Sequence, residues 1–435
     1  MRSFKTKIKF NNKEETKFLQ HAGTARHAWN WGLELCRDLI YKQEKQPTAI
    51  DLHKLLVKDV KSKNEWYYEV SKCSPQEALR DLYDAIQRFW KQHKINKTLP
   101  MNRCYLKRYL LQKQRGEIKK LHFEHERGFP RFKKKGQHDS FYLEGAIQID
   151  GNKIKVPKIG WLKTYETLPP DVTPKSVIIS RTANDWFIAF KIETEPIIVR
   201  HNTNTSVGVD LGIKTLATLS DGTIFESPKP YKKQKTKLRR LQRKLCRQRE
   251  VQKSLGLKKA SNNYVKTKNK IAKIHQRIAN IRIDNTHKLT SYLVKNHNRI
   301  TIEDLNVSGM TKNHNLASSI LDGGFYEFKR QIQYKCLWND VVLIIADKWF
   351  PSSQLCSCCG HKQKMPLKQR VYNCDFCGLS IDRDKNAAIN LNNYTPSYGV
   401  NACGATKFQN ASSVSGCESG IRQRLANVQV CIGSS

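Results

Sequence analysis

The chain has 435 residues, enough for two or three domains, and its 78 lysine and arginine residues outnumber its 38 acidic residues, giving a formal net charge of +40. Such a charge favours a long polyanion as the partner. No apolar run approaches the roughly 18 residues that span a membrane, and the N-terminus lacks the apolar stretch of a signal peptide. These features exclude a membrane-spanning protein, and we expect a cytoplasmic protein with no membrane partner.

The N-terminal third predicts one strand followed by a helical domain. Residues 1–12 alternate basic and apolar side chains, as an exposed strand does, and residues 13–119 show helical periodicity. Helix N-caps are predicted at Thr48 and at Ser74, the latter as a capping box with Glu77. The helix predicted from Glu14 to Tyr41 has an apolar stripe that steps by three and four, formed by Phe18, Ala22, Ala25, Trp29, Leu33, Cys36 and Ile40.

Two tryptophans in this first helix allow two interpretations. Trp29 lies on the apolar stripe, so packing is its plain interpretation, and Trp31 lies two residues further on. A Trp-Asn-Trp run could also stack nucleic-acid bases. Base stacking is the weaker interpretation for Trp29 and less so for Trp31, and both interpretations stay open at this point.

Residues 120–204 change to a period of two and predict short strands. Turns are predicted at Asp150-Gly151, at Ile159-Gly160 and between Ala183 and Asp185. With residues 1–12, these strands predict a small β-barrel. A segment within this region places four basic residues around an aromatic, which is typical of a loop that binds phosphates, although a solvated charge run would look the same. Its basic residues are Arg131, Lys133, Lys134 and Lys135.

Three acidic residues lie at the ends of predicted elements further along the chain. Asp210 follows an apolar strand, Glu303 ends the short β-branched run 298–304, and Asp384 lies where an alanine-rich helix begins. A lone aspartate after a strand is commonly a turn former or a helix cap. The three together are what a two-metal phosphoryl-transfer site requires, because two Mg²⁺ ions about 4 Å apart bind hard carboxylate oxygens.

A strongly basic helical hairpin is predicted between the strand of Asp210 and that of Glu303. Its first helix carries ten lysines and arginines from Lys232 to Arg249, with leucines on one side. One face is expected to pack, while the other presents cations to a phosphate backbone. The residues predicted to bind nucleic acid here are Lys232, Lys233, Arg239, Arg240, Arg243 and Lys244.

The fully apolar run 341–346 predicts a strand in the middle of a sheet, as parallel sheets contain. Strands of this kind, interleaved with helices and ending in acidic residues, predict a ribonuclease-H-like α/β nuclease core. We assign it to residues 205–354 and 379–394, so the fold class is a multidomain α/β protein with a helical domain and a small β-barrel.

Four cysteines predict a zinc ribbon in residues 355–378. Two Cys-x-x-Cys pairs, separated by fourteen residues and each followed by glycine, form two knuckles that complete a tetrahedron around Zn²⁺. A redox role would need only one pair, and four protein ligands indicate a structural zinc. The ligands are Cys356, Cys359, Cys374 and Cys377, and we leave out the additional Cys358. Most of the other cysteines of the chain stand singly, which suits reduced thiols.

These motifs together resemble the TnpB family, the transposon-encoded RNA-guided nucleases related to type V CRISPR effectors. The resemblance covers most of the chain from about 129 to 392, and the zinc ribbon just before the last acid is specific to this arrangement. The matching stretches, in the order of the family, are RFKKKGQHDSF, VGVDLGIKTLATLSDG, TIEDLNVSGM, FPSSQLCSCCGHKQ, YNCDFCG and DRDKNAAINL.

The resemblance implies a RuvC-like nuclease whose metal ligands are Asp210, Glu303 and Asp384. Asp384 is chosen over Asp382 because the family's acid is followed two residues later by asparagine, here Asn386. It further implies a split barrel, a helical domain that reads a short transposon-adjacent DNA motif, and a guide RNA derived from the transposon end. Double-stranded DNA melted by guide pairing would be the target, cut by a monomer with one RNA in a bacterial or archaeal nucleoid.

Two other functions compete with RNA-guided cleavage. An RNA-guided DNA-binding repressor would bind without cutting, but such relatives lose a catalytic acid and this chain has all three. A transposase would perform strand transfer with the same metal chemistry, and the position of the ribbon argues against it. The low-charge residues 395–435 predict a loosely ordered tail.

Overall fold

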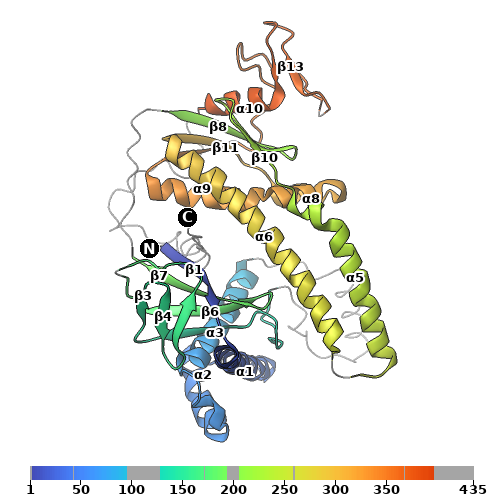
Figure 1. The fold of residues 1–435 in the computed structure, drawn as a ribbon. Coiled ribbons are helices and arrows are strands. Elements are labelled where there is room, and N and C mark those ends of the chain that lie inside the picture. Colours follow the sequence, from blue (N-terminus) through green and yellow to red (C-terminus); the bar gives the residue numbers. More distant parts are fainter. Residues whose placement is uncertain are drawn as a thin grey trace. The chain divides into compact units, whose positions relative to one another are not determined.

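The chain forms two compact units, the first within Met1–Thr194 and the second within Glu195–Glu418. The predicted tail from residue 396 onward, the end of the predicted helical domain and the start of the predicted barrel lie outside the described residues. The computed structural model describes residues 2–42, 44–95, 128–170, 172–193, 205–257, 260–366 and 368–395 (Figure 1).

The helices of the first unit bury the apolar stripe that the sequence predicts. Strand β1 (Arg2–Lys9) leads into α1 (Asn12–Lys42), in which Phe18, Ala22 and Leu33 are almost fully buried. A capping box of Thr48 and Asp51 begins α2 (Ala49–Leu55), as predicted. A π-helical turn (Leu56–Val60) and two 3₁₀ turns (Lys61–Lys63 and Glu65–Tyr67) then lead to α3 (Cys73–Ile95).

In the described part of the first unit, seven strands form an antiparallel sheet in the order β2-β6-β7-β1-β5-β4-β3. β1 lies in the middle, between β7 and β5, so the first residues of the chain join the strands after residue 139. This linear order is open among the described residues, and closure into a barrel stays a prediction. The other strands are β2 (Ser140–Glu144), β3 (Gln148–Asp150), β4 (Lys153–Val156), β5 (Gly160–Thr164), β6 (Ser176–Thr182) and β7 (Asp185–Ile192).

The turn between β6 and β7 follows the predicted hairpin. Ala183 and Asn184 have φ values of 48° and 74°, which is the backbone of a two-residue turn whose twist matches that of the strands. Apolar residues of this sheet, such as Ile179 and Ile188, share one core with α1 and α3. The sheet and the helices are therefore two layers around a common interior.

The second unit is built on a mixed sheet in the order β10-β9-β8-β11-β12. β8 pairs antiparallel with β9, which pairs antiparallel with β10, whereas β8, β11 and β12 run parallel. The mixed α/β unit agrees with the predicted fold class. The strands are β8 (Ser206–Leu211), β9 (Thr215–Leu219), β10 (Ile224–Glu226), β11 (Arg299–Glu303) and β12 (Val342–Ala346).

Helices α6 and α9 cover one face of this sheet, α10 (Arg383–Asn392) lies on the opposite face, and α5 and α6 form a long hairpin beside it (Figure 1). Leu289 and Leu293 of α6 and Phe328 of α9 share a core with β8 and β11. Asp322 of α8 fixes the base of the hairpin: it accepts bonds from the backbone N–H groups of Tyr231 and Lys232 and from Arg282. The helices are α5 (Pro230–Ser254), α6 (Asn262–Asn296), α7 (Val307–Met310), α8 (His314–Gly323) and α9 (Phe325–Asn339).

Helix α10 (Arg383–Asn392) packs directly on β8, where Gly208 permits a very close approach. A Cβ at Gly208 would lie 2.0 Å from the Ala388 carbonyl oxygen, so only glycine fits this contact. The small hairpin of β13 (Val371–Asn373) and β14 (Ser380–Asp382) leads straight into α10. Among the described residues, no helix is long and apolar enough to span a membrane.

Candidate active site and metal centre

The three predicted acids meet at one edge of the mixed sheet. Val209 pairs with Ile302 across the parallel strands β8 and β11, so the following residues, Asp210 and Glu303, lie at the same carboxyl-terminal edge. Asp384 lies in the first turn of α10, which packs on β8. Segments about 80 to 90 residues apart in sequence thereby place the carboxylates of Glu303 and Asp384 within electrostatic reach of Asp210.

The electrostatics of Asp210 reflect this convergence. Burial raises the pKa of Asp210 well above its ordinary value of 3.8, and the carboxylates of Glu303 and Asp384 raise it further. Burial also raises the pKa of Glu303, while a hydrogen bond donated by Ser352 lowers it. Such crowding of partly buried acids is unfavourable without a compensating cation, and it is a common feature of functional sites.

Asp382 and Asp384 have different roles in the structure. The Asp382 carboxylate caps α10 by accepting bonds of 3.0 Å from the backbone N–H groups of Asp384 and Lys385. The Asp384 carboxylate does not cap the helix, and its Oδ2 lies 3.9 Å from the Arg370 guanidinium. This difference supports the choice of Asp384 as the metal ligand, which remains a proposal.

The donor set suits hard divalent cations. Carboxylate oxygens are the ligands that Mg²⁺ prefers. The three acids are less tightly grouped than the cysteines, which form the only group of three or more His, Cys, Asp or Glu in the described chain with ligand atoms within 4.8 Å. A looser spread is compatible with two ions, because ions about 4 Å apart divide the ligands between them.

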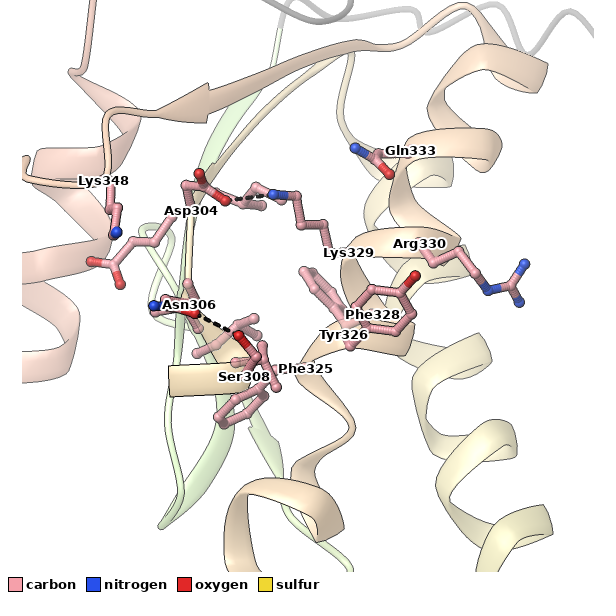
Figure 2. Close-up of a pocket in the computed structure, with 15 residues that line it drawn as sticks. Asp304, Asn306, Ser308, Phe325, Tyr326, Phe328, Lys329, Arg330, Gln333 and Lys348 are labelled. Atoms are coloured by element: carbon pink, nitrogen blue, oxygen red, sulfur yellow. Dashed lines mark hydrogen bonds and ion pairs between the residues drawn. The ribbon is translucent and has the colours of Figure 1, made fainter. Parts of the chain in front are cut away.

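A cavity of about 530 Å³ opens beside Glu303 and is shown in Figure 2. Asp304 lies on its wall and forms an ion pair of 2.5 Å with Lys329 of α9. Lys348, which is exposed, also lines it, as does Tyr326, whose side chain is 69% exposed. Sequence analysis missed these residues, because α9 reads as an ordinary helix and single lysines are frequent in so basic a chain.

The four predicted cysteines form two equivalent knuckles. Cys356 Sγ lies 3.6 Å from Cys377 Sγ, and Cys359 Sγ lies 3.6 Å from Cys374 Sγ. A tetrahedral zinc with bonds of about 2.3 Å requires sulfur atoms about 3.8 Å apart, so the cluster can hold zinc. Cys358 lies outside this group, as predicted.

Each knuckle closes on a glycine in the left-handed region. Gly360 and Gly378 both have φ of 73°, and their N–H groups donate 3.0 Å bonds to the carbonyl oxygens of Cys356 and Cys374. The backbone N–H groups of Cys377 and Phe376 lower the pKa of the Cys374 thiol to about 6. Burial and hydrogen bonds with the other three thiols raise the pKa of Cys359 to about 12, so the two neighbouring thiols ionise in very different pH ranges when no metal is bound.

The basic residues predicted on the hairpin are presented to solvent. All six have exposed side chains on α5, where Leu238 and Pro230 are the buried residues. They form a row of unshielded positive charge along one helix, as phosphate binding would need. Their role in nucleic-acid binding stays a proposal.

The basic segment at 131–135 is tied to α1. The Trp29 indole donates to the Arg131 carbonyl oxygen, and the Asn30 side chain exchanges two hydrogen bonds with the Lys133 backbone. The Lys133 ammonium lies 3.8 Å from the centre of the Trp29 ring, and burial lowers its pKa. Lys133 is thus engaged within the unit, while Arg131, Lys134 and Lys135 remain exposed candidates for phosphate contacts.

Three family models match successive segments of the chain. They are described as "Helix-turn-helix domain" (residues 1–45), "Probable transposase" (residues 189–314) and "Cas12f1-like, TNB domain" (residues 325–391). In the first segment the structure has β1 and the single helix α1 instead of two short helices. The third segment runs from α9 through the cysteine cluster to α10.

Two bacterial relatives are similar over most of their length. The Escherichia coli (strain K12) protein named "Putative RNA-guided DNA endonuclease InsQ" is 37% identical over 300 residues, 65% of this chain and 72% of that protein. A Streptomyces pristinaespiralis protein named "Putative RNA-guided DNA endonuclease" is 34% identical over 63% of this chain and 67% of its own length.

A solved structure of a Cas12f1-sgRNA-target DNA complex is also similar, with 14% identity over 90% of this chain and 98% of that chain and a TM-score of 0.28. A TM-score of this size does not establish a common fold. The family assignment rests on sequence: the three segments occur in order, and more than two thirds of the InsQ sequence is matched at 37% identity. The chain belongs to the TnpB family.

Proposed function

We propose that this protein is an RNA-guided DNA endonuclease with a single two-metal, RuvC-like site. It hydrolyses phosphodiester bonds of guide-matched double-stranded DNA next to a short transposon-adjacent motif. The observation that carries the proposal is the convergence of Asp210, Glu303 and Asp384 at one sheet edge in a chain whose relatives are named RNA-guided DNA endonucleases. The ribonuclease-H-like core is supported by the mixed sheet with acids at the ends of adjacent parallel strands.

The three carboxylates would hold two Mg²⁺ ions, which when bound supply an activated water and stabilise the leaving oxygen. The residues of the chain place the ligands for this chemistry. Parallel pairing of β8 with β11 sets the spacing of Asp210 and Glu303, and the close packing of α10 on Gly208 brings in Asp384. The four cysteines would hold one structural Zn²⁺.

Positive charge beside the acids would hold the DNA strand. Lys348 lies exposed on the wall of the cavity next to Glu303, and exposed Tyr326 offers a ring on which a base can stack. The row on α5 would contact the backbone of the nucleic acid. Because guide pairing reads the sequence, the protein itself needs backbone contacts more than base contacts, which agrees with a charge of +40.

Strand transfer is the second candidate, because one matched family is described as "Probable transposase". A repressor that binds without cutting is the third, and the retention of all three acids argues against it. The three functions give different products: cut ends for an endonuclease, joined strands for a transposase, and intact DNA for a repressor.

The test uses the full chain purified with its RNA from cells that express it together with the flanking transposon sequence. Sequencing the bound RNA identifies the guide, and a matched DNA with a randomised flank is then incubated with Mg²⁺. We expect cut ends that require Mg²⁺ and a preferred flank. Asp210→Ala should abolish cleavage and keep DNA binding, whereas Asp221→Ala, an exposed acid in the turn after β9, should cut normally. Cleavage by the Asp210→Ala protein would contradict the assignment.

A further inference from the structure

The segment that enters the cysteine cluster contacts one of the proposed catalytic acids, Glu303. Ser352 lies in the loop between β12 and Cys356, and its side chain is buried. Its hydroxyl donates a short hydrogen bond to Glu303 Oε1, across 49 residues of sequence. We propose that Ser352 is a positioning residue for Glu303, held in place by Asn386 and Asn390 of α10; this inference rests on the proposed function.

Two asparagines of α10 hold this loop. Asn390 Nδ2 donates to the carbonyl oxygens of Ser352 at 2.8 Å and Leu355 at 2.7 Å. Asn386 Nδ2 donates to the same Leu355 oxygen at 2.7 Å, and Asn386 Oδ1 accepts from the Ser357 N–H at 2.9 Å. The two residues are one turn apart, so they lie on the same face of the helix. Both are buried, at 0% and 7% exposure.

This arrangement links two of the proposed metal ligands, Glu303 and Asp384, to the same helix, α10. Asp384 lies on the helix that carries the two asparagines, and Glu303 is bonded to the loop that they hold. A shift of the loop would therefore change the position of Glu303 relative to Asp384. Removing a residue that forms a hydrogen bond with a metal ligand commonly changes metal affinity by about 10- to 100-fold.

A purely structural role would have a different outcome. The Ser352 hydroxyl and the asparagine amides also satisfy buried polar groups, and their loss could simply destabilise the fold. Destabilisation alone would lower the unfolding midpoint and the zinc content without weakening the binding of a divalent cation to the folded protein. The affinity of the carboxylates for a metal probe therefore separates the two roles.

The experiment measures Mn²⁺ binding by calorimetry and by the spin-resonance signal of free Mn²⁺. It uses the full-length, zinc-loaded protein freed of RNA. Ser352→Ala should bind Mn²⁺ about tenfold or more weakly with unchanged zinc content, and cleavage by the RNA-loaded variant should recover at high Mg²⁺. Ser353→Ala, the neighbouring serine for which the structure shows no such bond, is the matched control and should bind like the wild type.

Asn390→Ala provides a second test of the proposal that Ser352 positions Glu303. Since it acts through Ser352, its effect on Mn²⁺ affinity should not add to that of Ser352→Ala in the double variant. Wild-type affinity in Ser352→Ala, or full additivity with Asn390→Ala, would overturn the inference and leave the proposed function standing. If Asp210→Ala and the wild type bind Mn²⁺ equally, the metal site itself is absent, and both proposals fall.

Discussion

Asp210 occupies a position that is unfavourable for folding, and its neighbours explain why. Its partly buried carboxylate lies at the end of β8 and is repelled by Glu303 and Asp384, so its pKa is raised. In the unfolded chain the same group ionises freely near its ordinary pKa. As pH rises from about 4 through the folded-state pKa, the folded protein therefore loses stability relative to the unfolded chain.

Asp210→Asn should consequently stabilise the zinc-loaded, Mg²⁺-free protein while it abolishes cleavage. The gain should be absent at pH values below the ordinary aspartate pKa and should grow toward neutral pH. A gain of about 1 kcal/mol corresponds to roughly 2–4 °C in the unfolding midpoint of a unit of this size. Calorimetry of the zinc-loaded protein without added Mg²⁺, at pH 4 and pH 7.5, measures it. Asp304→Asn, which removes the ion pair with Lys329, should give no gain, and a pH-independent effect of Asp210→Asn would contradict the argument.

At the scale of elements, one buried acid anchors the helical hairpin. Asp322 is 5% exposed, accepts two N–H bonds from the first turn of α5, and contacts Arg282 of α6 at 2.8 Å. The carboxylate complements the positive end of the α5 dipole and a guanidinium at the same time. One side chain therefore joins α5, α6 and α8.

Asp322→Ala should destabilise the hairpin, because it leaves a partly buried arginine and two helix N–H groups without their acceptor. We expect a loss of about 3 kcal/mol in the free energy of unfolding, measured by denaturant titration, and faster proteolysis of α5. Asp284→Ala, which breaks the exposed pair with Lys288 on α6, should cost less than about 1 kcal/mol. Equal effects of the two variants would argue against the anchor.

The exposed row on α5 makes a separate prediction about salt dependence. Changing Arg239, Arg240, Arg243 and Lys244 to Gln should weaken nucleic-acid binding, and the slope of log K against log salt should fall by up to about 4. Fluorescence anisotropy at several salt concentrations measures the slope. The control changes four exposed lysines on or beside the sheet of the first unit, Lys153, Lys155, Lys163 and Lys175. If the salt-dependence slope falls equally in both quadruple variants, the total charge of the protein, and not the row on α5, determines nucleic-acid binding.

At the scale of the whole molecule, the cysteine cluster connects folding to the proposed chemistry. It lies between β12 and α10, and its entry loop contacts both Glu303 and the two asparagines. Zinc removal should therefore unfold the ribbon and also weaken Mn²⁺ binding at the carboxylates.

Cysteine variants test this coupling. Cys374→Ser should lose zinc and most of the Mn²⁺ affinity, while Cys358→Ser, outside the group, should keep one zinc per chain and full affinity. Elemental analysis and calorimetry measure the two quantities. A fully folded, active protein without zinc would refute the structural role assigned to the cluster.

Local sequence patterns were sufficient to predict features that depend on residues close together in the chain. The stripe of α1, the Thr48 capping box and the turn at 183–184 are confirmed, because each depends on residues a few positions apart. The capping box predicted at Ser74 is wrong. α3 begins at Cys73, and the Ser74 hydroxyl instead donates to the Tyr142 carbonyl oxygen of β2. A partner 68 residues away outcompeted the local one, and no local pattern contains it.

By itself, the sequence determined the chemistry that this protein can support: four thiols at knuckle spacing, three acids at the ends of predicted elements, and a large excess of positive charge. Residue type and local spacing carry that information. Only the tertiary structure decided which groups act together. It assigned Asp382 to the cap and left Asp384 available, placed Lys133 against Trp29, and brought Ser352 to Glu303. These contacts join segments far apart in the chain, and they exist only once the sheet and its helices have packed.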